Sequence, residues 1–235
     1  MLDLYEYGVQ KVNSTRHLFT LTELLTVITI FCLIAGILLP ALAVPVNRAK
    51  QLACSNNLRY IGQCVTFYST DNSGYIPNTV PGKDHNSTPL LRNSSNTTLA
   101  LGKLIECYTV NAEIFGCPDS PGYTAEDVEN DWQSAVNVCS AYLYRSQCGD
   151  FNNRLYAAGN LNKAYVMDLA CITPNGEEFA PHDYQMINLL FPDCHTESRR
   201  NTREPFRYFT IQTSYNKEDT LPGSIILWQH ADSQM

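Results

Sequence analysis

Charged side chains are scarce in this chain, and basic ones are the scarcer kind. Of its 235 residues 17% are charged, with 16 Lys and Arg against 23 Asp and Glu, so the formal net charge is −7. An average globular protein has roughly 25% charged residues. A general nucleic-acid binder needs a basic surface to neutralise phosphates. The composition therefore argues against that class, and we predict no nucleic-acid partner.

Sequence motifs of the common enzyme classes are also missing. The chain has no Gly-x-Ser-x-Gly, no phosphate-binding loop and no dinucleotide fingerprint. One nucleophile and base can be paired on paper, Cys194 with His182 or His195. No flanking motif accompanies that pair, and adjacent residues of a strand point to opposite faces. We therefore predict that the protein is not an enzyme and has no catalytic residues.

Metal-binding patterns are weak as well. No Cys-x-x-Cys occurs, and the spacings Cys107-x9-Cys117 and Cys139-x8-Cys148 are not those of zinc knuckles. No ligand run of the EF-hand type is present. We predict no metal site and no cofactor, and keep structural calcium at an acidic loop, such as Asp150 or Asp193, as the remaining option.

A long apolar run near the N-terminus is the clearest positive feature. The stretch from Leu24 to Asn47, LLTVITIFCLIAGILLPALAVPVN, carries no charge. As a helix it would be about 36 Å long, enough to cross a hydrocarbon core of about 30 Å. A buried core helix is seldom apolar all round for so long. A secretory signal is the stronger alternative, because Ala41-Leu42-Ala43 has the form of a signal-peptidase site.

The residues after this run predict an amphipathic helix. Cys54, Leu58, Ile61, Val65 and Tyr68 are spaced 4, 3, 4 and 3 residues apart, which places them on one helical face. We expect that the helix is continuous with the apolar run and stops near Gly74; the alternative is two helices broken at Pro45. Three further residues should widen the buried face: Tyr60, Cys64 and Phe67.

The N-terminal region resembles the type IV pilins and type II secretion pseudopilins. The match covers about residues 16–77 and rests on FTLTELL at 19–25, the apolar tail, Pro40 and CSNNLRYIG at 54–62. The resemblance implies cleavage between Leu18 and Phe19 and methylation of the new Phe19 amine. It also implies an assembly role for the Glu23 carboxylate and a helix kink at Pro40. The family's peptidase prefers Gly before the cut, where this chain has Leu18.

Two segments further on resemble pilin heads more loosely. Phe115-Gly116-Cys117-Pro118 is similar to a Phe-x-Cys-Pro turn, and residues 188–195, NLLFPDCH, are similar to a strand and turn that usually ends Asp-Gly-His. Cys194 stands where that pattern has Gly. His182 lies one residue too far upstream for the usual spacing.

The region after the span is long enough for one domain with its own core. Residues 78–98 are loop-like, rich in Asn, Ser and Thr, and contain three glycosylation-type sequons that we interpret as a solvated loop. A long helix followed by strands is an α+β pattern, here an antiparallel sheet packed on the helix as in pilins. The expected strands are Ala141–Tyr144, Ala164–Met167, Met186–Phe191, Tyr208–Ile211 and Ile225–Trp228.

Nine cysteines are many for a cytosolic protein. Setting Cys32 in the apolar run aside leaves an even number, which suits disulfides in an oxidising compartment. We predict a bridge between Cys54, on the inward helical face, and Cys117, in the Phe-x-Cys-Pro turn. The alternative is that Cys54 stays reduced in the core and only a local pair forms, such as Cys139 with Cys148.

Together, these features predict three segments: a cytoplasmic leader at 1–18, a transmembrane and assembly helix at 19–46, and an extracytoplasmic head at 47–235. The resemblance implies a structural subunit of a pilus or pseudopilus, held in a bacterial inner membrane before assembly. Its partners would be other pilin-like subunits, a prepilin peptidase, an inner-membrane assembly platform and membrane lipid. The alternative is a secreted or periplasmic binding protein whose signal peptide is cut after Ala43.

Overall fold

The computed structural model describes most of the chain. The described residues are 20–78, 86–93, 95–109, 111–120, 123–134, 137–147, 151–168, 171–172, 178–179, 182, 186–200, 228–229 and 231–232. The chain divides into two compact units, residues 1–45 and 46–235. Each unit is described on its own below.

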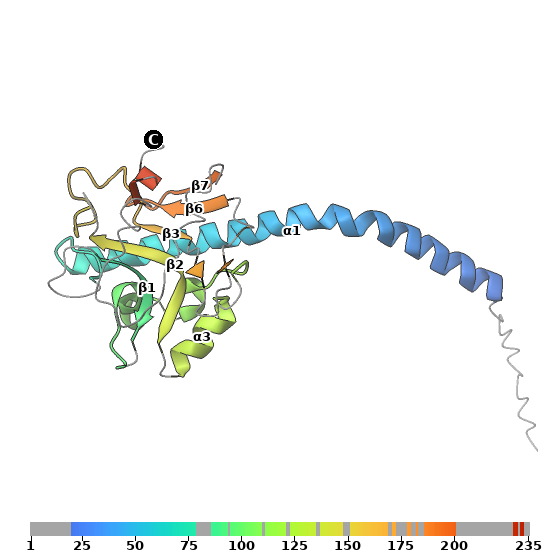
Figure 1. Cartoon of the computed structure of the whole chain (residues 1–235), viewed down its shortest axis with the longest axis horizontal. Coiled ribbons are helices and arrows are strands. Elements are labelled where there is room, and N and C mark those ends of the chain that lie inside the picture. The colour runs from blue at the N-terminus through green and yellow to red at the C-terminus, as the bar shows by residue number, and fades with distance from the viewer. Residues whose placement is uncertain are drawn as a thin grey trace, which may run out of the picture. The chain divides into compact units, whose positions relative to one another are not determined.

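Helix α1, Leu21–Asp71, begins in the first unit and ends in the second (Figure 1). It includes both Pro40 and Pro45, and the helical conformation continues through both prolines. The expected single helix is therefore confirmed, whereas the kink at Pro40 stays a prediction.

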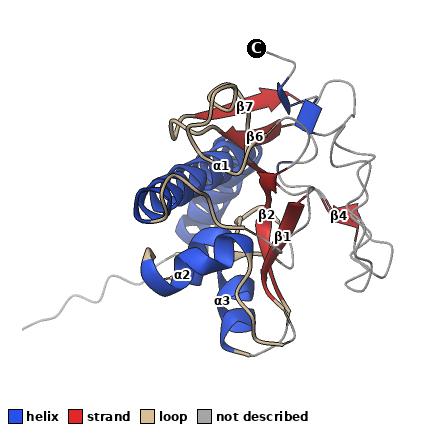
Figure 2. Ribbon diagram, turned by 90° about the vertical axis from the view of Figure 1, so that its left-hand side faces the viewer, coloured by secondary structure: helices blue, strands red, loops and turns tan. Residues whose placement is uncertain are grey.

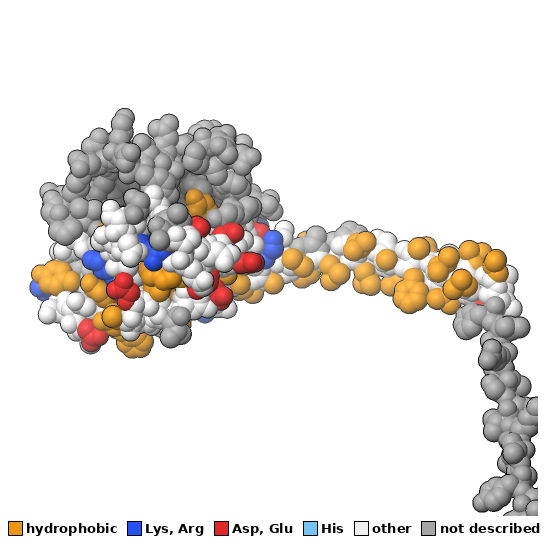
Figure 3. Space-filling view, turned by 90° about the horizontal axis from the view of Figure 1, so that it is seen from below, with side chains coloured by type: hydrophobic (Ala, Val, Ile, Leu, Met, Phe, Trp, Pro, Cys, Tyr) orange, Lys and Arg blue, Asp and Glu red, His pale blue; other side chains and the backbone are white. Residues whose placement is uncertain are grey.

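The first unit holds the apolar part of α1. Residues Leu21–Leu39 are long and apolar enough to cross a membrane, and none of this stretch is buried within the protein. Figure 3 shows hydrophobic side chains along this part of the helix. A membrane span and an N-terminal signal sequence both have these properties, so the structure is consistent with either.

The rest of α1 supplies one wall of the core of the second unit. The predicted inward face is confirmed, because Cys54, Leu58, Ile61 and Val65 are fully buried and Tyr68 is partly buried. Two residues expected to widen that face are exposed instead. The prediction was wrong for Tyr60 and Phe67, which are 41% and 60% exposed, whereas Cys64 is buried as expected. The buried arc is narrower because the sheet covers only one side of the helix.

The helix ends with a turn that needs a left-handed residue. After Asp71 the chain turns through residues 72–74, and Gly74 has φ +86°. Its amide donates to the Ser69 carbonyl at 2.7 Å, which satisfies one of the carbonyls left open at the helix end. Gly74 is therefore the stop signal that the sequence indicated.

A five-stranded antiparallel sheet forms the centre of the second unit (Figure 2). The strand order is β1-β2-β3-β6-β7, and a separate two-stranded sheet pairs β4 with β5. The bounds are β1 Asn86–Arg92, β2 Val138–Gln147, β3 Val166–Asp168, β4 Cys171–Ile172, β5 Glu178–Phe179, β6 Met186–Leu190 and β7 Thr196–Arg200.

The two faces of the sheet bury different side chains, as the period of two requires. Tyr142, Tyr144 and Leu190 belong to the cluster that includes the inward face of α1. Their neighbours Leu143 and Leu189 belong to a second cluster, which also contains Trp228. The α+β class is therefore confirmed as a helix packed on one face of an antiparallel sheet.

The strand predictions have mixed outcomes. Three expected strands correspond to β2, β3 and β6, while residues 208–211 and 225–227 lie outside the described residues. Trp228 is helical, not extended. Residues 86–92, expected in a loop, form strand β1, because its backbone pairs with β2 in spite of a polar sequence.

Short helices between β1 and β2 were not expected. They are a 3₁₀ turn at Ala100–Gly102, α2 at Lys103–Cys107, a 3₁₀ turn at Ala112–Phe115 and α3 at Ala125–Gln133. Helix α3 starts with a capping box in which Thr124 and Asp127 each satisfy the other's amide. That Thr-x-x-Asp spacing is visible in the sequence.

Candidate functional site

The first candidate site is the start of α1 in the first unit. Both the backbone amide and the hydroxyl of Thr20 donate to Glu23 Oε2 at 2.8 Å, and the Glu23 amide donates to Thr20 Oγ1 at 3.3 Å. These reciprocal bonds form a capping box, whose Thr-x-x-Glu signature precedes the apolar run. The predicted assembly carboxylate therefore also caps the helix. Leu18 and Phe19, the predicted processing residues, lie outside the described residues.

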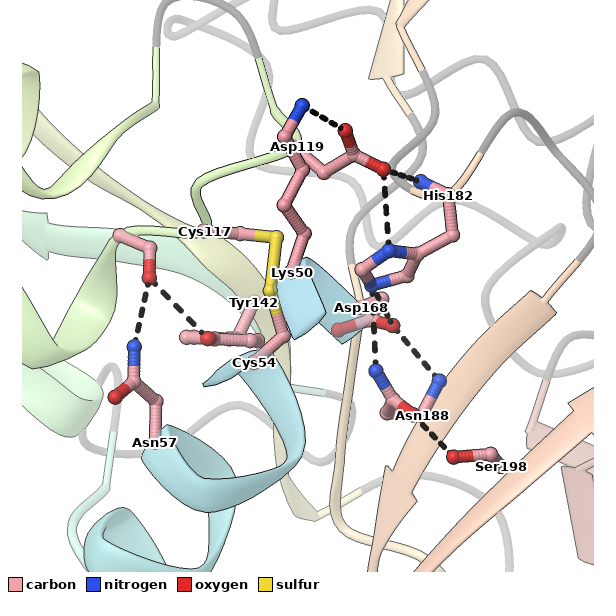
Figure 4. Close-up of a disulfide and its surroundings, with 11 residues drawn as sticks. Lys50, Cys54, Asn57, Cys117, Asp119, Tyr142, Asp168, His182, Asn188 and Ser198 are labelled. Atoms are coloured by element: carbon pink, nitrogen blue, oxygen red, sulfur yellow. Dashed lines mark hydrogen bonds and ion pairs between the residues drawn. A yellow bond between two sulfur atoms is a disulfide. The ribbon is translucent and has the colours of Figure 1, made fainter. Parts of the chain in front are cut away.

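The second candidate site surrounds a disulfide in the second unit (Figure 4). Cys54 of α1 and Cys117, which follows the 3₁₀ turn at Ala112–Phe115, are bonded, with their Cα atoms 5.5 Å apart. The predicted Cys54–Cys117 bridge is therefore confirmed. The alternative local pair is not tested, because Cys148 lies outside the described residues.

The backbone beside Cys117 is held by two side chains. The carbonyl of Gly116 accepts from Asn57 Nδ2 at 3.1 Å and from the Tyr142 hydroxyl at 3.2 Å. A Cβ at position 116 would lie 2.4 Å from the backbone nitrogen of Ala125. Only glycine fits there, so the turn that presents Cys117 to α1 is fixed by close packing against α3.

Asp119, two residues beyond the disulfide, connects α1 to His182. Lys50 Nζ donates to Asp119 Oδ1 at 2.9 Å, and the His182 amide donates to Oδ2 at 2.8 Å. Burial alone raises the pKa of the Asp119 carboxyl. The bonds from Lys50 and His182, with their positive charges, outweigh burial and lower this pKa below its ordinary value.

His182 lies between two carboxylates in the interior. Its Nδ1 is 3.2 Å from Asp119 Oδ2, at ion-pair distance without hydrogen-bond geometry, and its Nε2 is 3.4 Å from Asp168 Oδ2. The side chain is only 4% exposed. Burial acts to lower the pKa of this imidazole, but the interactions with Asp168 and Asp119 outweigh it and raise the pKa above its ordinary value.

Asp168 is held by the neighbouring strand. The backbone amide of Asn188 donates to Asp168 Oδ2 at 2.7 Å, and Ser198 Oγ donates to Asn188 Oδ1 at 2.5 Å. Asp168 Oδ1 is also buried, and no hydrogen bond reaches it from the residues that the structure describes. A buried carboxylate oxygen is usually hydrogen-bonded, so this one is open to a further partner.

These groups converge on the disulfide. The sulfur atoms of Cys54 and Cys117 and a ring nitrogen of His182 all lie within 4.8 Å of one another, and all three residues are buried. Local Cys spacing, from which we predicted no metal site, does not reveal ligands that come from three separate segments. One signal was available: Asp168 directly follows the apolar strand residues 164–167, where an ionisable group is unusual.

The cysteine and histidines that the sequence allowed as a nucleophile and base, a role we did not predict, have other contacts. Cys194 Sγ contacts Thr66 Oγ1 at 3.5 Å, and His195 Nδ1 contacts the carboxylate of Asp193. Within the described residues, no hydrogen bond joins Cys194 to His182 or His195. The hypothetical calcium ligand Asp193 is thus paired with His195, and Asp150 lies outside the described residues.

The turn at Asp193–His195 has a left-handed residue at its centre. Cys194 has φ +65°, in the left-handed region that favours glycine. The amide of Cys194 donates to the Phe191 carbonyl at 2.9 Å, and the Phe191 amide donates to the His195 carbonyl at 3.1 Å. The turn therefore keeps a backbone suited to glycine while carrying a thiol.

Comparisons with known proteins give no relative. No protein-family model matches the chain, and neither the curated proteins nor the solved structures include a significant match. Function is therefore inferred from the residues themselves.

Proposed function

We propose that this chain is a pilin-like structural subunit of a type IV pilus or a type II secretion pseudopilus. Before assembly it is anchored in a bacterial inner membrane by the apolar part of α1, with its second unit outside the cytoplasm. A prepilin peptidase cuts before Phe19, and the mature chain then joins other pilin-like subunits on an inner-membrane platform.

The observation that carries the proposal is the makeup of α1. Residues Leu21–Leu39 are mostly apolar and all exposed, and they include one carboxylate, Glu23, in the first turn. A soluble protein does not leave such a surface uncovered. An ionisable group at the edge of a membrane span is costly and usually marks function.

The chemistry of processing gives Glu23 a partner. A cut before Phe19 creates a cationic amine four residues from the carboxylate. In a packed assembly, the Glu23 carboxylate of an incoming subunit can pair with the Phe19 amine of a neighbour. Relief of an unpaired charge in an apolar surrounding then favours addition in register.

The disulfide supports an extracytoplasmic second unit. Structural disulfides form and persist in oxidising compartments and are rare in the cytosol. The Cys54–Cys117 bridge joins α1 to the turn before α3, and both cysteines lie within residues 46–235. This arrangement fits a head that matures outside the cytoplasm.

Three variants separate the two roles of Glu23. Glu23→Ala removes the charge and the cap, Glu23→Gln removes the charge but keeps an oxygen that accepts from the Thr20 amide, and Thr20→Ala weakens the cap but keeps the charge. We expect that both Glu23 variants insert into the membrane and assemble at a small fraction of the parental level. Thr20→Ala should assemble at close to that level.

The readout is the amount of each variant in sheared filaments relative to membrane-bound chain. Parental assembly of Glu23→Gln would overturn the charge-pairing account. The alternative, a secreted binding protein cut after Ala43, would give no filaments from any variant and a soluble chain that begins at Val44. The boundary between the two units, after Pro45, is close to that cut.

A further inference from the structure

We propose that Cys54, Cys117 and His182 form a Zn²⁺ site when the two cysteines are in the dithiol form. The disulfide and the metal are then alternative ways of joining α1 to the turn at Cys117. This inference does not depend on the proposed filament function.

The ligand set has the chemistry and the proximity that zinc needs. Zn²⁺ in proteins binds thiolate sulfur and imidazole nitrogen in a tetrahedron, with Zn–S bonds of about 2.3 Å and sulfur atoms about 3.8 Å apart. The three ligand atoms here lie within 4.8 Å of one another, and the two Cα atoms are 5.5 Å apart. Once the S–S bond is open, rotation of the two side chains separates the sulfurs to the zinc spacing.

The surroundings of His182 are those of a metal-binding histidine. Such histidines almost always have a carboxylate or carbonyl at the second ring nitrogen, which fixes the ring orientation. Asp119 faces Nδ1 and Asp168 faces Nε2, at 3.2 and 3.4 Å. When one nitrogen binds the metal, the carboxylate at the other nitrogen orients the ring.

A second, independent observation points to a missing ligand. Asp168 Oδ1 is buried and accepts no hydrogen bond within the described part of the chain, whereas Oδ2 accepts from the Asn188 amide. Asp168 is not among the three ligands that lie within 4.8 Å of one another, so we assign the fourth position to a water molecule, which can donate to Oδ1. The two thiolates balance the charge of Zn²⁺, so the metal with its four ligands carries no net charge.

Reduction of the disulfide needs only an added reductant and water. A phosphine reductant and one water convert the disulfide to two thiols and a phosphine oxide. Zn²⁺ then forms two Zn–S bonds and one Zn–N bond, and the two thiol protons go to solvent, together with the imidazolium proton when His182 is charged. Disulfide sulfurs are poor metal ligands, so the oxidised chain does not bind.

The test uses the full chain in detergent micelles, with Co²⁺ as the spectroscopic probe for Zn²⁺. We expect that the phosphine-reduced chain binds one Co²⁺ with thiolate-to-cobalt charge-transfer bands, which Zn²⁺ displaces. The oxidised chain should show no such bands. Absence of the bands from the reduced chain would overturn the proposal.

Variants assign the ligands. His182→Gln should weaken Co²⁺ binding at least tenfold, and Cys54→Ser with Cys117→Ser should abolish the thiolate bands. The matched controls are His195→Gln, an exposed histidine, and Cys64→Ser, a buried thiol outside the cluster; both should bind as the parent does. Parental affinity in His182→Gln would overturn the three-ligand assignment.

A measurement on the unsubstituted chain covers the case in which a variant fails to fold. Zn²⁺ should slow alkylation of Cys54 and Cys117 in the reduced chain at least tenfold and leave the exposed Cys107 unchanged. Equal alkylation of the two site cysteines with and without Zn²⁺ would contradict the proposal.

Discussion

The two parts of helix α1 have the same backbone and opposite surroundings. From Leu21 to Leu39 no side chain is buried and almost every one is apolar, whereas from Cys54 to Val65 one face is fully buried. In the first part none of the described residues covers the apolar surface. In the second part the sheet covers it. The spacing of apolar residues distinguishes the two parts. A helix that is apolar on all sides is stable in lipid or among other helices, whereas an amphipathic helix packs one face on the core of its own domain.

Matched leucine truncations test this comparison most strongly. Leu58→Ala empties a fully buried position and should lower the free energy of unfolding of the second unit by about 2–5 kcal/mol. Leu33→Ala, at a position 65% exposed, should leave that free energy unchanged. Denaturant titration followed by tryptophan fluorescence reports the second unit alone, because both tryptophans, Trp132 and Trp228, lie in it. Equal effects from the two truncations would break the comparison.

Removal of the disulfide should have the next largest effect. Cys54→Ser with Cys117→Ser opens a loop of sequence separation 63 and should cost about 2–4 kcal/mol of unfolding free energy. The measurement is made with a metal chelator present. Under a phosphine reductant the difference from the parent should shrink. Cys107→Ser, at an exposed cysteine, is the control and should match the parent.

We expect the stability of the second unit to depend on pH because of the buried His182. The folded chain raises the pKa of His182 above 6.5, so the stabilisation is fully present below pH 6.5 and is lost as pH rises through the folded pKa. The groups that face this imidazole are Asp119 and Asp168, with Lys50 paired to Asp119. The oxidised parent should lose stability above pH 6.5.

This pH dependence is tested with His182→Gln and controlled with His195→Gln. His182→Gln should remove the loss of stability above pH 6.5, and His195→Gln, at an exposed turn, should retain it. Denaturant midpoints measured across pH 5 to 9 decide between them. A parental slope in His182→Gln would mean that another group titrates.

The smallest expected change in stability concerns Cys194, which has a left-handed backbone conformation. Cys194→Gly and Cys194→Ala both remove the thiol that contacts Thr66, but only glycine relieves the left-handed backbone at φ +65°. Cys194→Gly should therefore be more stable than Cys194→Ala by about 1 kcal/mol. Thermal melts of the two variants provide the comparison. Equal melting temperatures would show that the backbone is not strained there.

Much of the fold follows from periodicity in the sequence. The spacing of Cys54, Leu58, Ile61 and Val65 predicted the buried face of α1, and apolar runs predicted β2, β3 and β6. The Cys54–Cys117 bridge was predicted because each cysteine was placed on a recognisable element. Tyr60 and Phe67 were placed wrongly, because aromatic character says nothing about how wide a face the sheet covers.

The remaining features depend on tertiary contacts. Strand β1, NSTPLLR, forms by backbone pairing with β2, and its sequence has no apolar alternation that would predict a strand. The His182 cluster joins residues from α1, the turn at Asp119, strand β3 and the segment before β6, and no local motif links them. The two capping boxes, at Thr20–Glu23 and Thr124–Asp127, were readable from spacing alone.

The mature N-terminus is the most direct test of the central claim, that α1 is a processed assembly helix. The chain is expressed in a bacterium that carries a prepilin peptidase, and the mass of its first tryptic or acid-cleaved peptide is measured. The account predicts an N-methylated Phe19, with Leu18→Gly giving the same product faster. A chain that begins at Val44, in the parent and in Leu18→Gly alike, would contradict it.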